Sequence, residues 1–287
     1  MDSADGKILI ANDNLKVEIA LMGAELARIT DKNGCERLWD GDAKFWTGRA
    51  PVLFPYAGGL KDGYFEYRGK RYDNPTKHGF AKITPFSVLE KTGTGASLRL
   101  EERVPSYPFD YRFTVRYALE GNALRVDYIT ENAGADEMYF GVGCHEAYRL
   151  DGGVEHYFLT ADREEEWLHY PLEGAQILRE GVRMGTPGKT FRFREEHFAV
   201  DALVFRDIRS RGVTLKNDLN EKTVRVDFEG FDHLLVWKKP KAGFLCIEPW
   251  VNPPEWVDGG HDITEKPGIV RLAPGGKDVR THVITFG

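Results

Sequence analysis

Cysteine is scarce in this chain of 287 residues. The three cysteines, Cys35, Cys144 and Cys246, are odd in number and widely separated, and no Cys-x-x-Cys pair occurs. This usage is typical of a reducing compartment and argues against both a disulfide framework and a zinc site. None of the eight histidines lies in a His-x-His or His-Glu-x-x-His arrangement. We therefore expect no metal ion.

Long apolar runs and basic blocks are also missing. No run approaches the roughly 18–20 apolar residues that cross a membrane, and residues 1–12 lack the pattern of a signal peptide. The formal net charge of −6 comes without an extended basic block, which argues against a surface for nucleic acid. We expect a cytoplasmic protein with neither membrane nor nucleic-acid partners. Its oligomeric state stays open.

Motifs for nucleotides and for serine hydrolysis are absent as well. The pair Gly93-x-Gly95 does not extend into a dinucleotide fingerprint, and the chain has no Walker loop and no Gly-x-Ser-x-Gly elbow. We therefore expect a protein that works without a cofactor.

Apolar and polar residues alternate with period two along most of the chain, which predicts strands. The clearest segments are 15–19, 97–101, 111–117, 124–128, 213–215, 224–228, 234–237, 269–272 and 279–284. Helices are expected only as short pieces, near Asp42–Trp46 and Glu195–Val200. Because no Pro- or Ser-rich linker interrupts the chain, we expect a single domain over residues 1–287. The pattern predicts an all-β fold, a large antiparallel β-sandwich with few short helices.

A carboxylate interrupts one of the apolar segments, Cys-Ile-Glu-Pro-Trp at 246–250. Alternate side chains of a strand point to opposite faces, so Phe244, Cys246, Glu248 and Trp250 are expected on one face. Apolar neighbours raise the pKa of a carboxyl group toward neutrality, which suits proton transfer. The alternative is a structural Glu at a strand end, ion-paired or solvated where Pro249 stops the strand.

Two histidines and one arginine also lie in informative contexts. His78 precedes a glycine, which lets backbone come close to a ligand, and His145 follows Gly141 and Gly143, which leave space beside its ring. Arg49 precedes an apolar segment, where its planar fork of donors could bind hydroxyl groups. A hydrogen-bonded turn or core histidine and a surface ion pair are the structural alternatives.

Five segments, in this order, resemble the aldose 1-epimerase (galactose mutarotase-like) family, most closely its bacterial LacX-like branch. They are APVLFP at 50–55, HGFA at 78–81, GCHEAY at 143–148, DALVF at 201–205 and CIEPW at 246–250. The resemblance implies a β-supersandwich whose concave face binds a hexose, and an isomerase that interconverts α and β anomers without a cofactor. It also implies that Glu248 is the catalytic base, His145 the catalytic acid, and His78 and Asp201 substrate-binding residues.

Two positions depart from the family pattern. The chain has Gly58-Gly59 where the family commonly has an arginine after Phe-Pro, and Lys82 where an arginine commonly follows His-Gly-Phe-Ala. Lysine and arginine are not equivalent at a bidentate hydroxyl or carboxylate site. The identity of the sugar therefore stays open, and Lys82 and Arg49 join the candidates for substrate binding.

Three other functions are compatible with the sequence. A hexose-phosphate 1-epimerase needs a cationic subsite, for which the candidates are Arg49, Lys61, Arg71 and Lys82. A carbohydrate-binding protein without turnover would keep the same fold and cleft. A glycoside hydrolase would need Asp201 as a second carboxylate beside Glu248.

Overall fold

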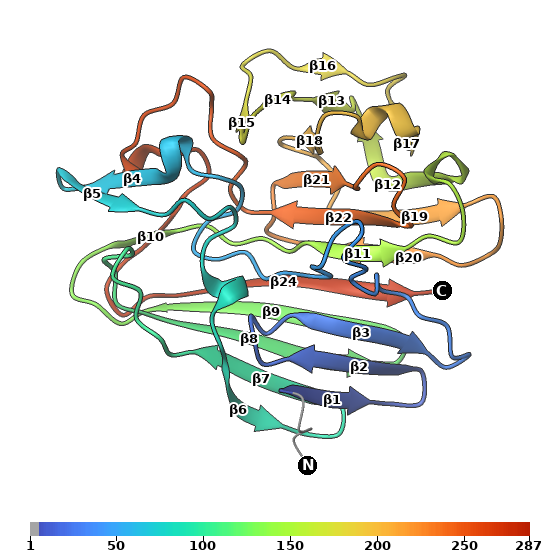
Figure 1. The fold of residues 1–287 in the computed structure, drawn as a ribbon, viewed down its shortest axis with the longest axis horizontal. Coiled ribbons are helices and arrows are strands. Elements are labelled where there is room, and N and C mark those ends of the chain that lie inside the picture. The colour runs from blue at the N-terminus through green and yellow to red at the C-terminus, as the bar shows by residue number, and fades with distance from the viewer. Residues whose placement is uncertain (1–5) are drawn as a thin grey trace.

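Residues 6–287 are described here from a computed structural model, and the largest element in them is a nine-stranded antiparallel sheet (Figure 1). Its strands lie in the order β17-β12-β19-β20-β24-β9-β8-β7-β6. Their bounds are β6 (Ser87–Lys91), β7 (Gly95–Leu100), β8 (Tyr111–Glu120), β9 (Ala123–Asn132), β12 (Tyr157–Glu165), β17 (Gly188–Arg192), β19 (Gly212–Asn217), β20 (Val224–Asp227) and β24 (Lys277–Phe286).

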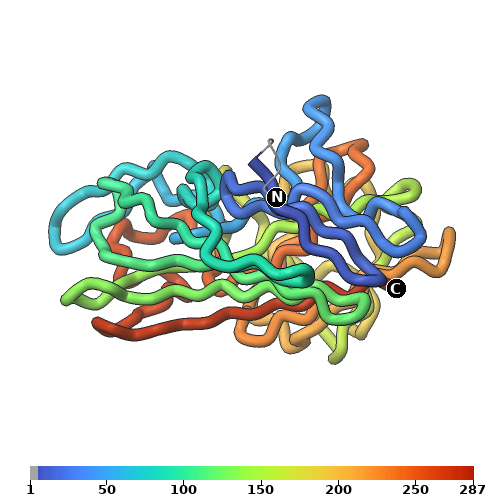
Figure 2. The backbone as a smooth tube through the Cα atoms, turned by 90° about the horizontal axis from the view of Figure 1, so that it is seen from below, coloured from blue at the N-terminus to red at the C-terminus, as the bar shows by residue number. Residues whose placement is uncertain are grey.

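A six-stranded antiparallel sheet and a three-stranded one complete the larger layers of the described chain. The six strands lie in the order β11 (Glu146–Arg149), β22 (Phe244–Trp250), β21 (His233–Trp237), β18 (Leu203–Phe205), β13 (Leu168–His169) and β16 (Val182–Arg183). The three are β1 (Lys7–Ala11), β2 (Leu15–Ala20) and β3 (Leu26–Asp31). In Figure 2 these blue N-terminal strands lie over the long green and red strands of the nine-stranded sheet.

Short hairpins and single turns of 3-10 helix fill the connections. The paired short strands are β4 (Tyr64–Tyr67) with β5 (Lys70–Asp73), β10 (Met138–Phe140) with β23 (Val270–Leu272), and β14 (Leu172–Glu173) with β15 (Gln176–Ile177). The helical turns are η1 (Lys61–Gly63), η2 (Ala81–Ile83), η3 (Val154–His156), η4 (Glu195–Phe198) and η5 (Ile263–Glu265). Between residues 6 and 287, no helix is long and apolar enough to cross a membrane.

One continuous apolar core joins the three larger sheets. It contains alternate residues of each layer, for example Val17 in β2, Val226 in β20 and Ile247 in β22. Each such side chain is fully buried, and full burial of an aliphatic side chain stabilises a fold by roughly 1.5–3 kcal/mol. The period-two pattern of the sequence is therefore the pattern of this core, because each strand turns one set of side chains toward it.

The predicted fold class is confirmed. Every strand segment expected from the alternation coincides with a strand of the structure, and Gly121-Asn122 forms the turn of the β8–β9 hairpin. Of the two expected helical segments, 195–200 contains η4. The other, Asp42–Trp46, is a turn closed by hydrogen bonds from the backbone N–H groups of Phe45 and Trp46 to the carbonyl of Asp42.

A backbone crossing anchors the loop that carries His78. The buried Phe54 stacks on Phe113 of β8, with ring centroids 4.0 Å apart. Its carbonyl accepts hydrogen bonds from the N–H groups of Phe80 and Ala81. Gly79 has a φ of +69°, and a Cβ built there would overlap that same carbonyl. Glycine at 79 is therefore required by close packing of two backbones, not by a ligand.

Replacing Gly79 by alanine tests this crossing. We expect Gly79→Ala to lower the free energy of unfolding by clearly more than the ~1–2 kcal/mol that a left-handed conformation costs an ordinary residue. Gly69→Ala is the matched control, because Gly69 has a φ of +73° and open space around its Cα. Urea denaturation measures both variants. Equal losses in the two would contradict a steric role for Gly79.

Candidate active site

A cleft of about 600 Å³ opens on the face of the six-stranded sheet that points away from the core. This volume lies within the range of about 300–1,000 Å³ found for small-molecule sites. Its wall contains five of the six residues predicted to act on a substrate: His78, Lys82, His145, Asp201 and Glu248. Segments that are far apart in sequence therefore meet at one place.

Glu248 lies on β22, an interior strand between the edge strand β11 and β21. It is 1% exposed. Phe244 and Cys246 belong to an apolar cluster on its side of the sheet, and Trp250 lines the cleft with it, whereas Ile247 points into the core. The predicted sharing of one face is confirmed. The alternative of a solvated strand end is wrong.

Pro249 does not end the strand, contrary to that alternative. It pairs with Leu234 of β21 within β22, and its carbonyl accepts a hydrogen bond from the N–H of Cys144. The missing N–H of the proline therefore leaves the ladder intact on both sides of Glu248.

His145 precedes β11 and faces Glu248. Its Nε2 lies 3.4 Å from Oε2 of Glu248, and its ring packs against Trp46 and Trp237, with centroids 5.1 and 5.7 Å away. Among residues 6–287, Nδ1 of His145 and Oε1 of Glu248 are buried and have no hydrogen-bond partner. Buried polar atoms are almost always paired, so these two atoms are unusual.

Burial favours the uncharged form of both groups. It raises the pKa of Glu248 well above its usual value, helped by the charges of Asp201 and Glu146. Burial also lowers the pKa of His145 to about 3. The uncharged pair and the carboxylate–imidazolium pair contain the same single mobile proton. One proton transfer across this contact therefore interconverts the two forms of the pair.

His78 is held as a neutral donor. Its backbone N–H donates to the carbonyl of Gly58, and the N–H of Gly58 donates to Nδ1 of the imidazole over 3.1 Å. Because Nδ1 accepts, the proton of the neutral ring lies on Nε2. Burial lowers the pKa of His78 well below its usual value, with further contributions from His145, Lys82 and Lys77. The Nε2–H of His78 is therefore available as a donor, and the ring does not titrate near neutral pH.

Charged side chains gather at the rim of the cleft. Lys82 is half-buried and Lys77 exposed, and neither ammonium group has an ion-pair partner within residues 6–287. Lys238, by contrast, pairs with Glu195 at 2.6 Å. Asp201 is half-buried, and its carboxylate accepts a hydrogen bond from the N–H of Ala202. Asp201 retains one carboxylate oxygen, Oδ2, for a ligand.

Arg49 lies outside the wall of the cleft. Its guanidinium donates to the carbonyl of Asp40, and its backbone N–H donates to the carboxylate of Glu25. The side chain therefore braces the loop before the apolar segment, and the placement gives no support to a role in substrate binding. The sequence shows that Arg49 has several donors, but it does not show whether they bind a ligand hydroxyl or a backbone carbonyl.

The glycines near the site lie against other side chains of the protein, not against open space for a ligand. A Cβ on Gly143 would lie 2.7 Å from Trp250, and one on Gly141 would overlap Asn252. The space at these two glycines is therefore filled by Trp250 and Asn252, and the open space beside His145 is that of the cleft it lines. At Gly59, a Cβ would lie 2.7 Å from Ala175 and 3.4 Å from Lys77. The position where an arginine was expected has no room for one.

Sequence reasoning missed three residues in the wall of the cleft: Trp46, Trp237 and Lys77. The position of Trp237 could have been predicted from the period of two in β21. Leu235 and Trp237 point into the cleft, whereas Leu234 and Val236 point into the core. Trp46 and Lys77 lie in loops, where no period reports the direction of a side chain.

Two buried groups combine the side-chain types that bind zinc. They are Cys144 with Glu146 and His282, and Cys246 with His145 and Glu248; in each, the ligand atoms lie within 4.8 Å of one another. Burial raises the pKa of both thiols well above the usual value, whereas a metal is bound by the thiolate. That the protein works without a metal stays a prediction.

A family model for aldose 1-epimerase matches residues 6–268 of the chain. The chain belongs to the aldose 1-epimerase family. This is a family of isomerases, and a mutarotase-type function follows from membership. Among curated proteins, this aldose 1-epimerase family member is similar to the chromosomal protein LacX of Lactococcus lactis subsp. lactis, with 27% identity covering 97% of this chain and 99% of that protein.

Solved structures agree with the family. A galactose mutarotase related enzyme from Lactobacillus acidophilus is 28% identical, with a TM-score of 0.89 over 98% of this chain and 97% of that chain. A galactose mutarotase-like protein from Lactobacillus casei is 25% identical, with a TM-score of 0.91 over 98% and 100%. The galactose mutarotase-like fold of the β-sandwich is thus shown.

The charge state of Glu248 predicts how stability depends on pH. The pKa of Glu248 is raised on folding, so the wild type loses stability as the pH rises from its unfolded-state value toward its folded-state value. Glu248→Gln does not have this loss. We expect the variant to unfold at a higher temperature than the wild type at pH 8, and the difference to shrink toward pH 4. Thermal denaturation across this range tests it, and a variant that is less stable at pH 8 would contradict the assigned shift.

Proposed function

We propose that the protein is an aldose 1-epimerase that interconverts the α and β anomers of a hexose without a cofactor, with Glu248 as base and His145 as acid. The observation that carries the proposal is the contact between their side chains, 3.4 Å long and nearly closed to solvent. The anomeric hydroxyl and the ring oxygen of a pyranose are bonded to one carbon. Two adjacent groups, one accepting and one donating, suit that pair of oxygens.

The reaction then moves two protons in opposite directions. The anomeric hydroxyl gives its proton to the Glu248 carboxylate while the His145 imidazolium protonates the ring oxygen, so the bond from C1 to the ring oxygen breaks and C1 becomes an aldehyde. Rotation about C1–C2 presents the other face of the aldehyde, and the reverse transfers close the ring. His78 donates through Nε2 to a sugar oxygen, and Asp201 and Lys82 bind hydroxyls at the rim.

Removal of either group should abolish most turnover. We expect Glu248→Gln and His145→Asn each to lower kcat by about 10²–10⁴-fold, the usual contribution of a positioned acid or base. The double variant should lose little more than either single variant, because the two residues act as one unit. Polarimetry on fresh α-D-glucose and α-D-galactose measures all three. Wild-type turnover in Glu248→Gln would refute the assignment.

The same assay distinguishes an epimerase from a carbohydrate-binding protein without turnover. It would show no epimerisation above the buffer rate in the wild type, and sugar would stabilise the wild type and Glu248→Gln against heat equally.

A hexose phosphate is a second candidate substrate, favoured by the two unpaired ammonium groups of Lys77 and Lys82 at the cleft. Of the four cations considered from sequence, Lys82 alone lines the cleft, since Lys61 donates to a backbone carbonyl, Arg71 pairs with Asp73 and Arg49 lies outside. Lys77, which was not considered from sequence, also lines the cleft and lies next to Gly59.

The lysine pair predicts a selective effect on anionic sugars. We expect Lys77→Ala with Lys82→Ala to raise KM for a hexose 6-phosphate by about tenfold or more, the cost of losing a charge-assisted hydrogen bond. KM for the free hexose should change less. Lys91→Ala, an exposed lysine of β6, is the control. A wild type that prefers the free sugar, or equal changes for both sugars, would remove this candidate.

A further inference from the structure

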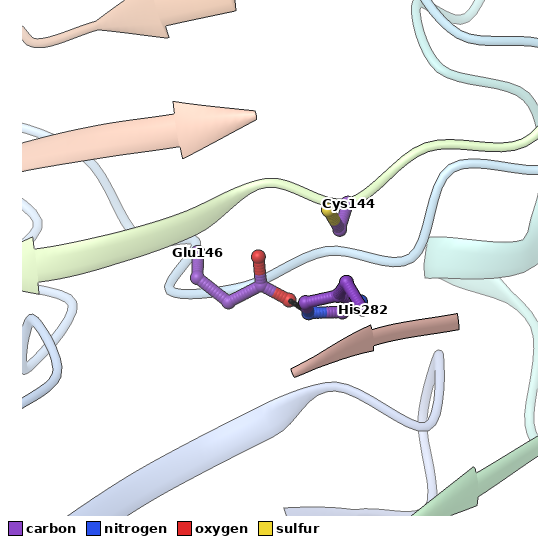
Figure 3. Close-up of side chains that lie close together, drawn as sticks. All are labelled: Cys144, Glu146 and His282. Atoms are coloured by element: carbon purple, nitrogen blue, oxygen red, sulfur yellow. Dashed lines mark hydrogen bonds and ion pairs between the residues drawn. The ribbon is translucent and has the colours of Figure 1, made fainter. Parts of the chain in front are cut away.

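Glu146 and His282 form a second buried acid–imidazole pair (Figure 3). The pair lies on the core side of the six-stranded sheet, whereas the cleft lies on the other face. The Nε2 atom of His282 lies 3.1 Å from Oε1 of Glu146, and Cys144 lies beside them. Glu146 is 2% exposed and His282 is fully buried. The catalytic scheme above uses neither residue, and isolated charge is costly at such depth, so the pair needs a physical reason.

The register of the sheet places Glu146 directly behind the reacting groups. Glu146 of β11 pairs with Ile247 of β22, and both point into the core. Their neighbours, His145 and Glu248, point the other way, into the cleft. Because neighbouring residues alternate across a strand, any shift of Glu146 along or across the sheet moves His145 with it.

The hydrogen bond also joins two layers. His282 belongs to β24 in the nine-stranded sheet, where its ring stacks on Tyr128 of β9 at a centroid distance of 5.7 Å. Glu146 belongs to β11, an edge strand of the six-stranded sheet. Apolar packing alone tolerates sliding, whereas this bond fixes one register between the two layers.

Among residues 6–287, Glu146 has no lysine or arginine as an ion-pair partner, and His282 is its partner at 3.1 Å. Burial, reinforced by the Glu146 charge, raises the pKa of the phenols that face it, Tyr117 of β8, Tyr128 of β9 and Tyr148 of β11, and of the Cys144 thiol. The second carboxylate oxygen, Oε2, has no partner among the described residues. The field of this carboxylate therefore reaches across the sheet to Glu248, which otherwise faces Asp201 and His145.

We propose that Glu146 and His282 are a positioning pair for the acid–base site: their bond fixes His145 through β11, and the buried charge of Glu146 holds the shared proton on the Glu248–His145 pair. The assignment rests on the proposed function. Two residues in the interior of the sandwich would then affect the reaction, although neither touches the substrate.

Two variants separate charge from placement. Glu146→Gln keeps the size of the side chain and removes its charge, so the Glu248–His145 pair should bind its proton less tightly. We expect the pH profile of kcat/KM to move toward lower pH by about one unit, as for loss of a neighbouring like charge. Glu146→Asp keeps the charge but is too short to hold His282. It should leave the pH midpoints in place and lower kcat by about tenfold.

The control is Glu165→Gln, which makes the same exchange at a buried carboxylate bonded to Ser210 and outside the cleft. Its pH profile should match the wild type. A second readout needs no turnover: the ¹³C signal of the Glu248 carboxyl, assigned by its loss in Glu248→Gln, should titrate at lower pH in Glu146→Gln.

The outcomes distinguish the two proposals. A wild type without epimerase activity would refute the proposed function, while the ¹³C titration would still test the effect of Glu146. An active wild type whose pH profile and Glu248 titration are unchanged by Glu146→Gln would overturn the electrostatic part. A kcat in Glu146→Asp equal to that of the wild type would overturn the positioning part. If Glu146→Gln does not fold, the kcat of Glu146→Asp is the measurement that tests the proposal.

Discussion

Burial of a carboxyl group on an interior strand of a β-sheet is the constraint on which the rest of this site depends. Water does not stabilise the Glu248 charge at 1% exposure, so the neighbouring side chains determine whether the group ionises. The aromatic wall around His145, the neutral His78 and the close backbone crossing at Gly79 all keep water out or fix a hydrogen-bond donor. The fold thus favours the uncharged forms of Glu248 and His145.

The two faces of the six-stranded sheet have different surroundings. On β22, Ile247 belongs to the core that joins the sheets and Glu248 to the cleft. If the pairing of β22 shifted by one residue, Glu248 would point into the core and Ile247 into the cleft. Pairing on both sides of β22 prevents such a slip. Stability and reactivity are therefore set by the same ladder of hydrogen bonds.

Strand positions could be predicted from sequence because their physical cause is local. Alternation placed Glu248 and Trp250 on one face correctly, and the family motifs brought His78, His145 and Asp201 to one cleft. Arg49, Trp46 and Lys77 could not be placed in the same way. They lie in loops, where the direction of a side chain is set by residues distant in sequence, such as Asp40 and Glu25 around Arg49. The glycines before His145 were misread for a related reason: a small residue marks close approach without saying what approaches.

The packing at Gly59 links three positions into one unit. Ala175 lies against the face of Gly59 where a side chain would start, and Lys77 covers the adjoining space. A larger residue at 59 therefore requires a smaller or displaced partner at 175 and a different path for the lysine. Substitutions carried over singly from relatives would be incompatible here, although the same changes made together need not be. The residue at 59 can therefore change only together with its neighbours at 77 and 175.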